Sequence, residues 1–169
     1  AKQNSQIQFT TKDELENWVI VNDTVMGGRS RAGLGIQDEY LMFAGDLSLQ
    51  NNGGFASTRR VNAPVEWSGK QALQITIKGD GRAYQFRLRT NRNWDGVAYV
   101  AEFQTAEGED QVIEFNLSDF QPLFRGRYVR GAPTLKFEDV SQVGFMLADK
   151  KPGEFVLLVK EIKQLPEFI

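Results

Sequence analysis

The sequence contains neither cysteine nor histidine in its 169 residues. Without cysteine, the chain cannot form disulfides, thiolate metal sites or a thiol nucleophile. Without histidine, it cannot use Ser-His-Asp hydrolysis, histidine-ligated zinc or the usual proton shuttle near neutral pH. These absences remove the commonest hydrolase and metal chemistries. We therefore expect a protein that is not an enzyme and that carries no cofactor and no metal.

Long apolar runs and an excess of basic residues are also missing. The longest apolar run, residues 155–159, is far shorter than the ~20 residues that cross a bilayer, so no transmembrane segment is expected. The net charge of −2 argues against a general nucleic-acid binder. The first residues show no leader or transit pattern. A cytoplasmic location is the expectation, with a removed leader as the alternative.

The composition that remains is that of an ordinary globular protein, with 41% hydrophobic and 25% charged residues. A chain of this length corresponds to one domain with one core. We interpret residues 1–169 as a single domain.

Strict alternation of apolar and polar residues dominates the chain after residue 72. Alternation with a period of two indicates half-buried strands of antiparallel sheets. With turn signals between the strands and almost no helix, the pattern predicts an all-β, two-sheet sandwich of the jelly-roll type. The side chains that we expect between the sheets are Leu73, Ile75, Phe86, Leu88, Phe103, Phe115, Phe145 and Phe155.

Two segments depart from this pattern. Residues 11–14 fit a capping box and predict a short helix, and Trp18 is interpreted as a core anchor rather than as a ligand platform. Residues 118–133 contain prolines, glycines and three arginines, and they are interpreted as a long irregular connection.

Two Gly-Gly pairs in residues 22–59, which we call the Gly-Gly corners, carry the strongest local structural signals in the chain. They lack the spacing of dinucleotide or phosphate-binding loops, so we read them as turns. At least one of their glycines is expected to have φ > 0, at a cost of about 1 kcal/mol or more if alanine replaces it. The residues assigned to this structural motif are Asn22, Asp23, Met26, Gly27, Gly28, Gly53 and Gly54.

Several motifs resemble the complex I intermediate-associated protein 30 family. They are NDTVMGGRS at residues 22–30, FAG at 43–45, LSLQNNGGFASTR at 47–59, YQFRLR at 84–89, GFMLA at 144–148 and GEF at 153–155. The resemblance covers nearly the whole chain. It implies a galactose-binding-domain-like jelly roll, and the eukaryotic member of the family assists assembly of respiratory complex I.

Arginine placement suggests a recognition surface. Arg87 and Arg89 share one face of a predicted strand, and Arg59 ends another motif. We expect the polar side chains on neighbouring strands of this face to be Glu102, Gln104, Glu114 and Asn116. Two readings stay open: a solvated face with ion pairs, or a face that binds sugars or partners. Trp94 in a polar turn and Asn52 in the second corner complete the candidate binding residues.

We therefore interpret the chain as a non-enzymatic binding or assembly module. It would recognise a protein partner, such as a subunit of a membrane complex, through a polar, arginine-bearing sheet face. The alternative is a carbohydrate-binding jelly roll that binds a glycan and holds a structural calcium ion, which would leave no clear sequence trace.

Overall fold

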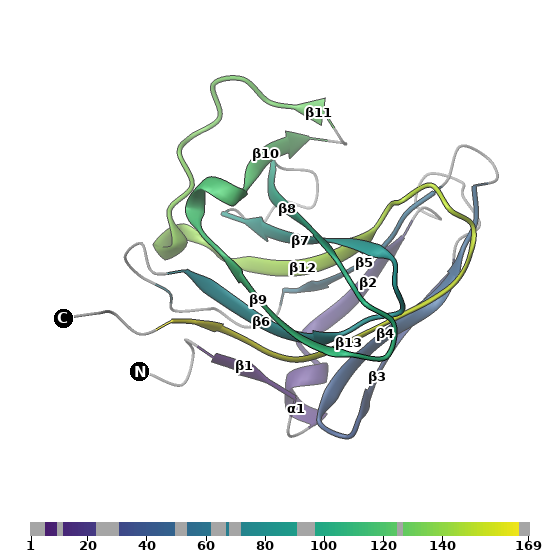
Figure 1. Ribbon diagram of the computed structural model, residues 1–169. Coiled ribbons are helices and arrows are strands. Elements are labelled where there is room, and N and C mark those ends of the chain that lie inside the picture. Colours follow the sequence, from purple (N-terminus) through teal and green to yellow (C-terminus); the bar gives the residue numbers. More distant parts are fainter. Residues whose placement is uncertain are drawn as a thin grey trace.

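The computed structural model describes residues 6–9, 12–22, 31–49, 54–61, 67, 72–90, 97–124 and 127–165. In this part of the chain almost all regular structure is β, and the strands form two sheets stacked face to face (Figure 1). All pairings between the named strands are antiparallel. The predicted all-β jelly-roll sandwich is confirmed.

The first sheet, called sheet A, has six strands. In spatial order they are β3 (Arg31–Gln37), β4 (Tyr40–Leu47), β13 (Gly153–Gln164), β6 (Leu73–Lys78) and β9 (Asp110–Phe115), and β1 (Gln6–Gln8) pairs with β13 beside this path. The long strand β13 therefore occupies the centre of sheet A and joins strands that do not pair with one another (Figure 1).

The second sheet, called sheet B, has seven strands. In spatial order they are β11 (Arg127–Tyr128), β10 (Gln121–Phe124), β8 (Ala98–Gln104), β7 (Ala83–Arg89), β12 (Gln142–Leu147), β5 (Ala56–Arg60) and β2 (Trp18–Asn22). Three short helical segments complete the described part: α1 (Lys12–Leu15) and the 3₁₀ turns η4 (Leu117–Asp119) and η5 (Phe137–Asp139).

Aromatic rings fill the space between the sheets. All eight side chains expected there are buried, because each lies on the inward face of its strand. Neighbouring ring centroids are 5.1 to 6.3 Å apart, within the range of favourable aromatic contacts. The connected rings are those of Phe9, Trp18, Tyr84, Phe86, Phe103, Phe115, Phe120, Phe137 and Phe145.

Helix α1 is held against sheet B by one carboxylate. Glu14 accepts hydrogen bonds from the Arg60 guanidinium at 2.7 and 3.1 Å and from the Trp18 indole N–H at 2.9 Å. Trp18 is 5% exposed and stacks on Phe145, which confirms that it is a core anchor. The predicted helix is confirmed, while Thr11 of the capping box lies outside the described residues.

The interpretation of residues 118–133 as irregular is wrong. The segment begins within η4 and continues into β10 and β11, which extend sheet B beyond β8. Pro122 lies within β10, whereas Gly131 and Pro133 follow β11 outside the strands, so these residues did not mark the whole segment as a loop.

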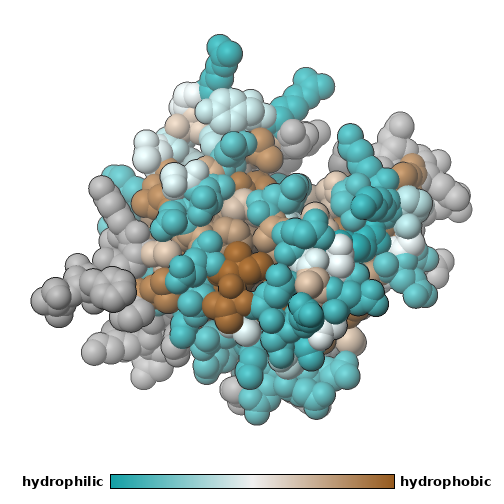
Figure 2. Space-filling model, in the orientation of Figure 1, coloured by the Kyte–Doolittle hydropathy of each residue, from teal (hydrophilic) through white to brown (hydrophobic). Residues whose placement is uncertain are grey.

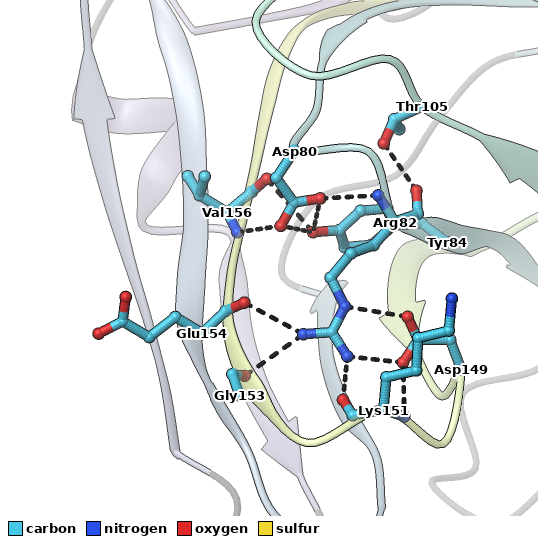
Figure 3. Close-up of polar contacts among 9 residues, drawn as sticks. All are labelled: Asp80, Arg82, Tyr84, Thr105, Asp149, Lys151, Gly153, Glu154 and Val156. Atoms are coloured by element: carbon cyan, nitrogen blue, oxygen red, sulfur yellow. Dashed lines mark hydrogen bonds and ion pairs between the residues drawn. The ribbon is translucent and has the colours of Figure 1, made fainter.

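A polar cluster closes the gap that opens where β6 ends (Figure 3). The last β6 residue, Lys78, pairs with Leu158, so the backbone of Val156 on β13 has no β6 partner. The Asp80 carboxylate accepts a hydrogen bond from Val156 N–H at 2.9 Å. The Tyr84 hydroxyl lies 3.2 Å from Val156 O and 3.0 Å from both Asp80 carboxylate oxygens, so these acceptors share its one proton. Side chains thus satisfy backbone groups that would otherwise be buried without partners.

The surface in this orientation is largely hydrophilic, and the most strongly hydrophobic area lies near the middle of the view (Figure 2). Large exposed apolar side chains in the described part include Val112, at 61% exposed, and Tyr128, at 63%. No helix of the described residues is long and apolar enough to span a membrane.

Candidate functional site

The outer face of sheet B brings the candidate arginines together. Paired residues of antiparallel strands lie on the same face, and Gly144 of β12 pairs with Arg87 of β7 on one side and with Arg59 of β5 on the other. Arg89 pairs with Gln142, two residues further along the same two strands, so this pair lies on the same face. We call this surface, formed by Arg59, Arg87, Arg89, Gln142, Gly144 and Met146, the arginine face.

The arginine face is hollowed at its centre. The hollow is small, with a cavity volume of about 10 Å³. Its lining residues come from the adjacent strands β5, β12 and β7 and are Ser57, Thr58, Arg59, Arg87, Arg89, Gln142, Val143, Gly144 and Met146. None of these residues is aromatic, so the lining offers no ring on which a sugar could stack.

Gly144 forms the floor of the hollow because no side chain fits there. A Cβ at this position would lie 2.4 Å from the carbonyl oxygen of Thr58 and 3.4 Å from the Cα of Arg59. Glycine inside a strand commonly marks such close backbone approach. The missing side chain leaves open the space between the two arginines that flank it.

Arg87 is largely buried and has no carboxylate within ion-pair distance in the described part of the chain. Its Nη1 donates to Gln85 Oε1 at 2.7 Å and contacts Met146 Sδ at 3.2 Å. Burial, and secondarily the nearby charge of Arg59, lower the pKa of Arg87 to about 10. The guanidinium is therefore still charged at neutral pH, although it is taken out of water without an anion.

Two other buried arginines are matched by carboxylates. Arg60 pairs with Glu14 at 2.7 Å. Arg82 donates to both oxygens of Asp149, at 2.6 and 2.9 Å, and to the carbonyl oxygens of Gly153, Glu154 and Lys151 (Figure 3). These hydrogen bonds are the chief reason that the pKa of Arg82 is raised. Both arginines are structural, and Arg87 differs from them in chemistry.

Gln142 adds an unmet hydrogen-bonding group. Its side chain lines the hollow and is only 7% exposed. In the described part of the chain its Oε1 is buried without a hydrogen-bond donor. Buried polar atoms are almost always paired, and a hollow of about 10 Å³ has room for about one water molecule, which can supply the donor.

One part of the expected polar face is wrong. Glu102 and Gln104 do lie on β8 of sheet B, where Glu102 pairs with Gln85. Glu114 lies instead on β9, which pairs with β6 in sheet A, and Asn116 follows that strand. Alternation places a side chain on a face of its strand, but it does not show to which sheet the strand belongs.

Other predicted residues are distributed as follows. Gly54 has φ +136°, which confirms the expectation that at least one corner glycine is left-handed. Asn22 is the last residue of β2 and pairs with Ala56. Trp94, Asn52, Asp23, Met26, Gly27, Gly28 and Gly53 lie outside the described residues.

Sequence reasoning missed Gln142, Gly144 and Met146. They occupy alternate positions of a strand that the sequence did predict, so they share one face. A glycine inside such a strand, here Gly144 between Gln142 and Met146 on the same face, signals that another backbone approaches closely. That signal becomes a site only when β5 and β7 are known to flank β12.

A second hollow is wider and more open, and it lies on sheet A beside the cluster of Figure 3. Small and acidic residues line it, among them Gly33, Ala44, Asp46, Asp80 and Glu154. The Asp80 carboxylate is already used by three donors: Val156 N–H, Arg82 N–H and the Tyr84 hydroxyl. Among the described residues, no cluster of three or more carboxylates is arranged to hold a metal ion.

Residues 7–159 match the complex I intermediate-associated protein 30 (CIA30) family, which is most of the chain. The chain belongs to the CIA30 family. The family resemblance found in the sequence motifs is thereby confirmed.

One curated relative carries the name of the CIA30 family, and solved structures share the fold. An uncharacterized protein of Schizosaccharomyces pombe is 27% identical over 90% of this chain and 81% of its own length. The mitochondrial complex I intermediate-associated protein 30 of Mus musculus is 26% identical over 89% of this chain, which spans only 52% of that protein. The family 11 carbohydrate-binding module of Clostridium thermocellum, solved with a mixed-linked tetrasaccharide, has a TM-score of 0.66 at 18% identity and 96% and 98% coverage. At that identity the likeness shows the fold alone.

Proposed function

We propose that this CIA30 chain is a non-enzymatic assembly module that holds a protein partner against the arginine face of sheet B. The observation that carries the proposal is Arg87, a desolvated cation at the centre of a hollowed face with no carboxylate of the described chain beside it. Isolated buried charges are costly, so they persist where another molecule compensates them.

The partner we propose is a subunit of a membrane complex, and respiratory complex I is the first candidate. Membership of the CIA30 family and the mouse relative support this choice. Sheet B suits the role because its outer face spans seven strands. A broad face is needed, since interfaces of standard size bury ~800 Å² on each partner.

The capture experiment uses the tagged chain and detergent-solubilised membranes of its native host, with mass spectrometry of the bound proteins. We expect the native chain to retain complex I subunits, and the Arg87→Met variant to retain at least tenfold less, since a central desolvated arginine is a typical hot spot. Arg127→Met on β11 removes the same charge from an exposed position and should capture normally. Equal capture by all three proteins would place the interface away from the arginine face.

Glycan binding is the second candidate, and Tyr128 is the observation that favours it. This side chain is 63% exposed and pairs with Leu123, which pairs with Ala98, so it lies on the outer face of sheet B at the far edge. An exposed ring of this kind can stack on a sugar. Affinity electrophoresis in mixed-linked β-glucan tests the idea: retardation that is lost in Tyr128→Ala and kept in Arg87→Met would favour a glycan over a protein partner.

A further inference from the structure

We infer that the arginine face is a receptor for a single carboxylate, contributed by an Asp or Glu side chain of the partner and seated over Gly144 between Arg59 and Arg87. This inference rests on the proposed function, and it adds the chemistry of the group that is bound.

The geometry of sheet B sets the seat of the carboxylate. Gly144 on β12 pairs with Arg59 on one side and with Arg87 on the other. Strand β12 therefore separates the two arginines, and at Gly144 it carries no side chain between them. Neighbouring strands are ~4.8 Å apart, which places the two arginine backbones roughly 10 Å from each other. Arginine side chains are long enough for both guanidinium groups to reach a carboxylate held above Gly144.

The charges around the seat also favour an anion. Arg59 is close enough to Arg87 for its charge to act on that group. The polar neighbours of Arg87 in the described chain are a neutral amide, Gln85, and a thioether, Met146. Two positive charges on one partly buried face raise the local positive potential, which attracts an anion.

The lining of the hollow narrows the class of anion. It contains no aromatic residue on which the ring of a sugar acid could stack. An acidic side chain needs no such platform, because its carboxylate alone meets the guanidinium groups. We therefore commit to an acidic side chain, and a sugar acid becomes an outcome of the test.

The direct test is a titration of the ¹⁵N-labelled chain, followed through the Gly144 amide and the Arg87 guanidinium resonances. The probe is N-acetyl-aspartate methylamide, and N-acetyl-asparagine methylamide is its uncharged match. We expect saturable shifts with the aspartate probe, binding at least tenfold weaker with the asparagine probe, and loss of the shifts in Arg87→Met. Well-dispersed spectra of that variant establish that it is folded.

Three results would overturn the inference. Equal shifts with both probes would show that the charge is irrelevant. Shifts with sulfate as strong as those with aspartate would indicate an adventitious anion only. Tighter binding of glucuronate than of aspartate would assign the seat to a sugar acid rather than to an acidic side chain.

A built-in carboxylate provides the second test. Met146 lies on the arginine face with its sulfur beside Arg87 Nη1, so Met146→Glu should occupy the seat from within the chain, and Met146→Gln is the neutral match. We expect Met146→Glu to weaken both aspartate binding and capture of complex I subunits at least tenfold more than Met146→Gln, because the two variants differ only in the charge placed beside Arg87. Normal aspartate binding by Met146→Glu would overturn the carboxylate seat. Absence of capture by the native chain, with aspartate binding intact, would overturn only the proposed function.

Discussion

At the scale of single residues, three arginines show that local partners determine what a guanidinium does. Every nitrogen of the Arg82 guanidinium donates a hydrogen bond, and Arg60 is fixed by Glu14, so both fasten the fold. Arg87 has an amide and a thioether for neighbours. The cost of burying the charge is therefore compensated by carboxylates at the first two positions and is not compensated by one at the third in the described chain.

Replacement of Arg87 by methionine should accordingly stabilise the chain. The variant keeps most of the apolar stem beside Met146 and removes a charge that is desolvated without an anion. We expect the free energy of unfolding to rise by about 1 kcal/mol, because apolar replacements of poorly compensated buried charges are commonly neutral or stabilising. Urea denaturation at pH 7 measures it, with Arg127→Met as the exposed control. A loss of stability would mean that Arg87 is structural.

At the scale of elements, the β3–β4 hairpin turns on two residues that are not glycine. Asp38 has φ 53° and Glu39 has φ 68°, and the strands pair from Gln37 and Tyr40 onward. Two-residue hairpin turns of this kind need φ > 0 at both central positions, where Asn-Gly is preferred. Glu39 therefore holds a left-handed conformation that costs roughly 1 kcal/mol or more for a residue with a Cβ.

Glu39→Gly is expected to raise the free energy of unfolding by about 0.5 to 1 kcal/mol, since it relieves this conformation at an exposed position. Thermal and chemical unfolding both measure the change. Glu138→Gly in η5 is the control, because Glu138 is exposed and its φ is not positive. That variant should lose stability. A loss of stability in Glu39→Gly as well would show that flexibility of the unfolded chain outweighs the turn strain.

The turn between β12 and β13 depends on the Arg82–Asp149 pair. Burial acts to raise the pKa of Asp149, but hydrogen bonds from Arg82 and from Lys151 N–H, with the charge of Arg82, outweigh it and lower the pKa. A lowered pKa in the folded state means that the ionised form contributes stability above the unfolded-state pKa of about 3.9. That contribution is lost as the pH falls through the lowered, folded-state pKa.

Asp149→Asn should therefore destabilise the chain by about 1 to 2 kcal/mol at pH 7, the usual range for charge-assisted hydrogen bonds. The difference from the native chain should be constant between about pH 5 and 8, and should shrink below about pH 4 as the native carboxylate is protonated. Denaturation at a series of pH values measures it. A difference that stays the same at pH 3 would show that the hydrogen bonds do not depend on the ionised carboxylate.

At the scale of the whole molecule, the sequence predicts which face of a strand is buried more reliably than it predicts which strands pair with one another. Alternation identified the inward side of Phe86 and Phe145 correctly, because the burial of one strand face depends only on that strand. It misplaced Glu114, because the sheet to which β9 belongs depends on its pairing with β6. Antiparallel pairing between strands distant in sequence leaves no local pattern.

The candidate site has the same limit. Arg59, Arg87 and Arg89 were identifiable from their residue type and position on a strand. Their approach to one another depends on the insertion of β12 between β5 and β7, and that insertion also brings Gly144 and Gln142 to the site. The unmet acceptor of Gln142 is a property of the packed face, so no reading of one strand could have found it.

The central position of β13 affects the order in which the molecule can be built. A ribosome delivers β13 after β1, β4 and β6, and it is the strand that pairs with all three. Until then β3 and β4 can form only a hairpin, and β6 and β9 can form only a separate pair. Sheet A therefore assembles after translation has passed residue 164, and its unfinished edges are exposed to other chains until that moment.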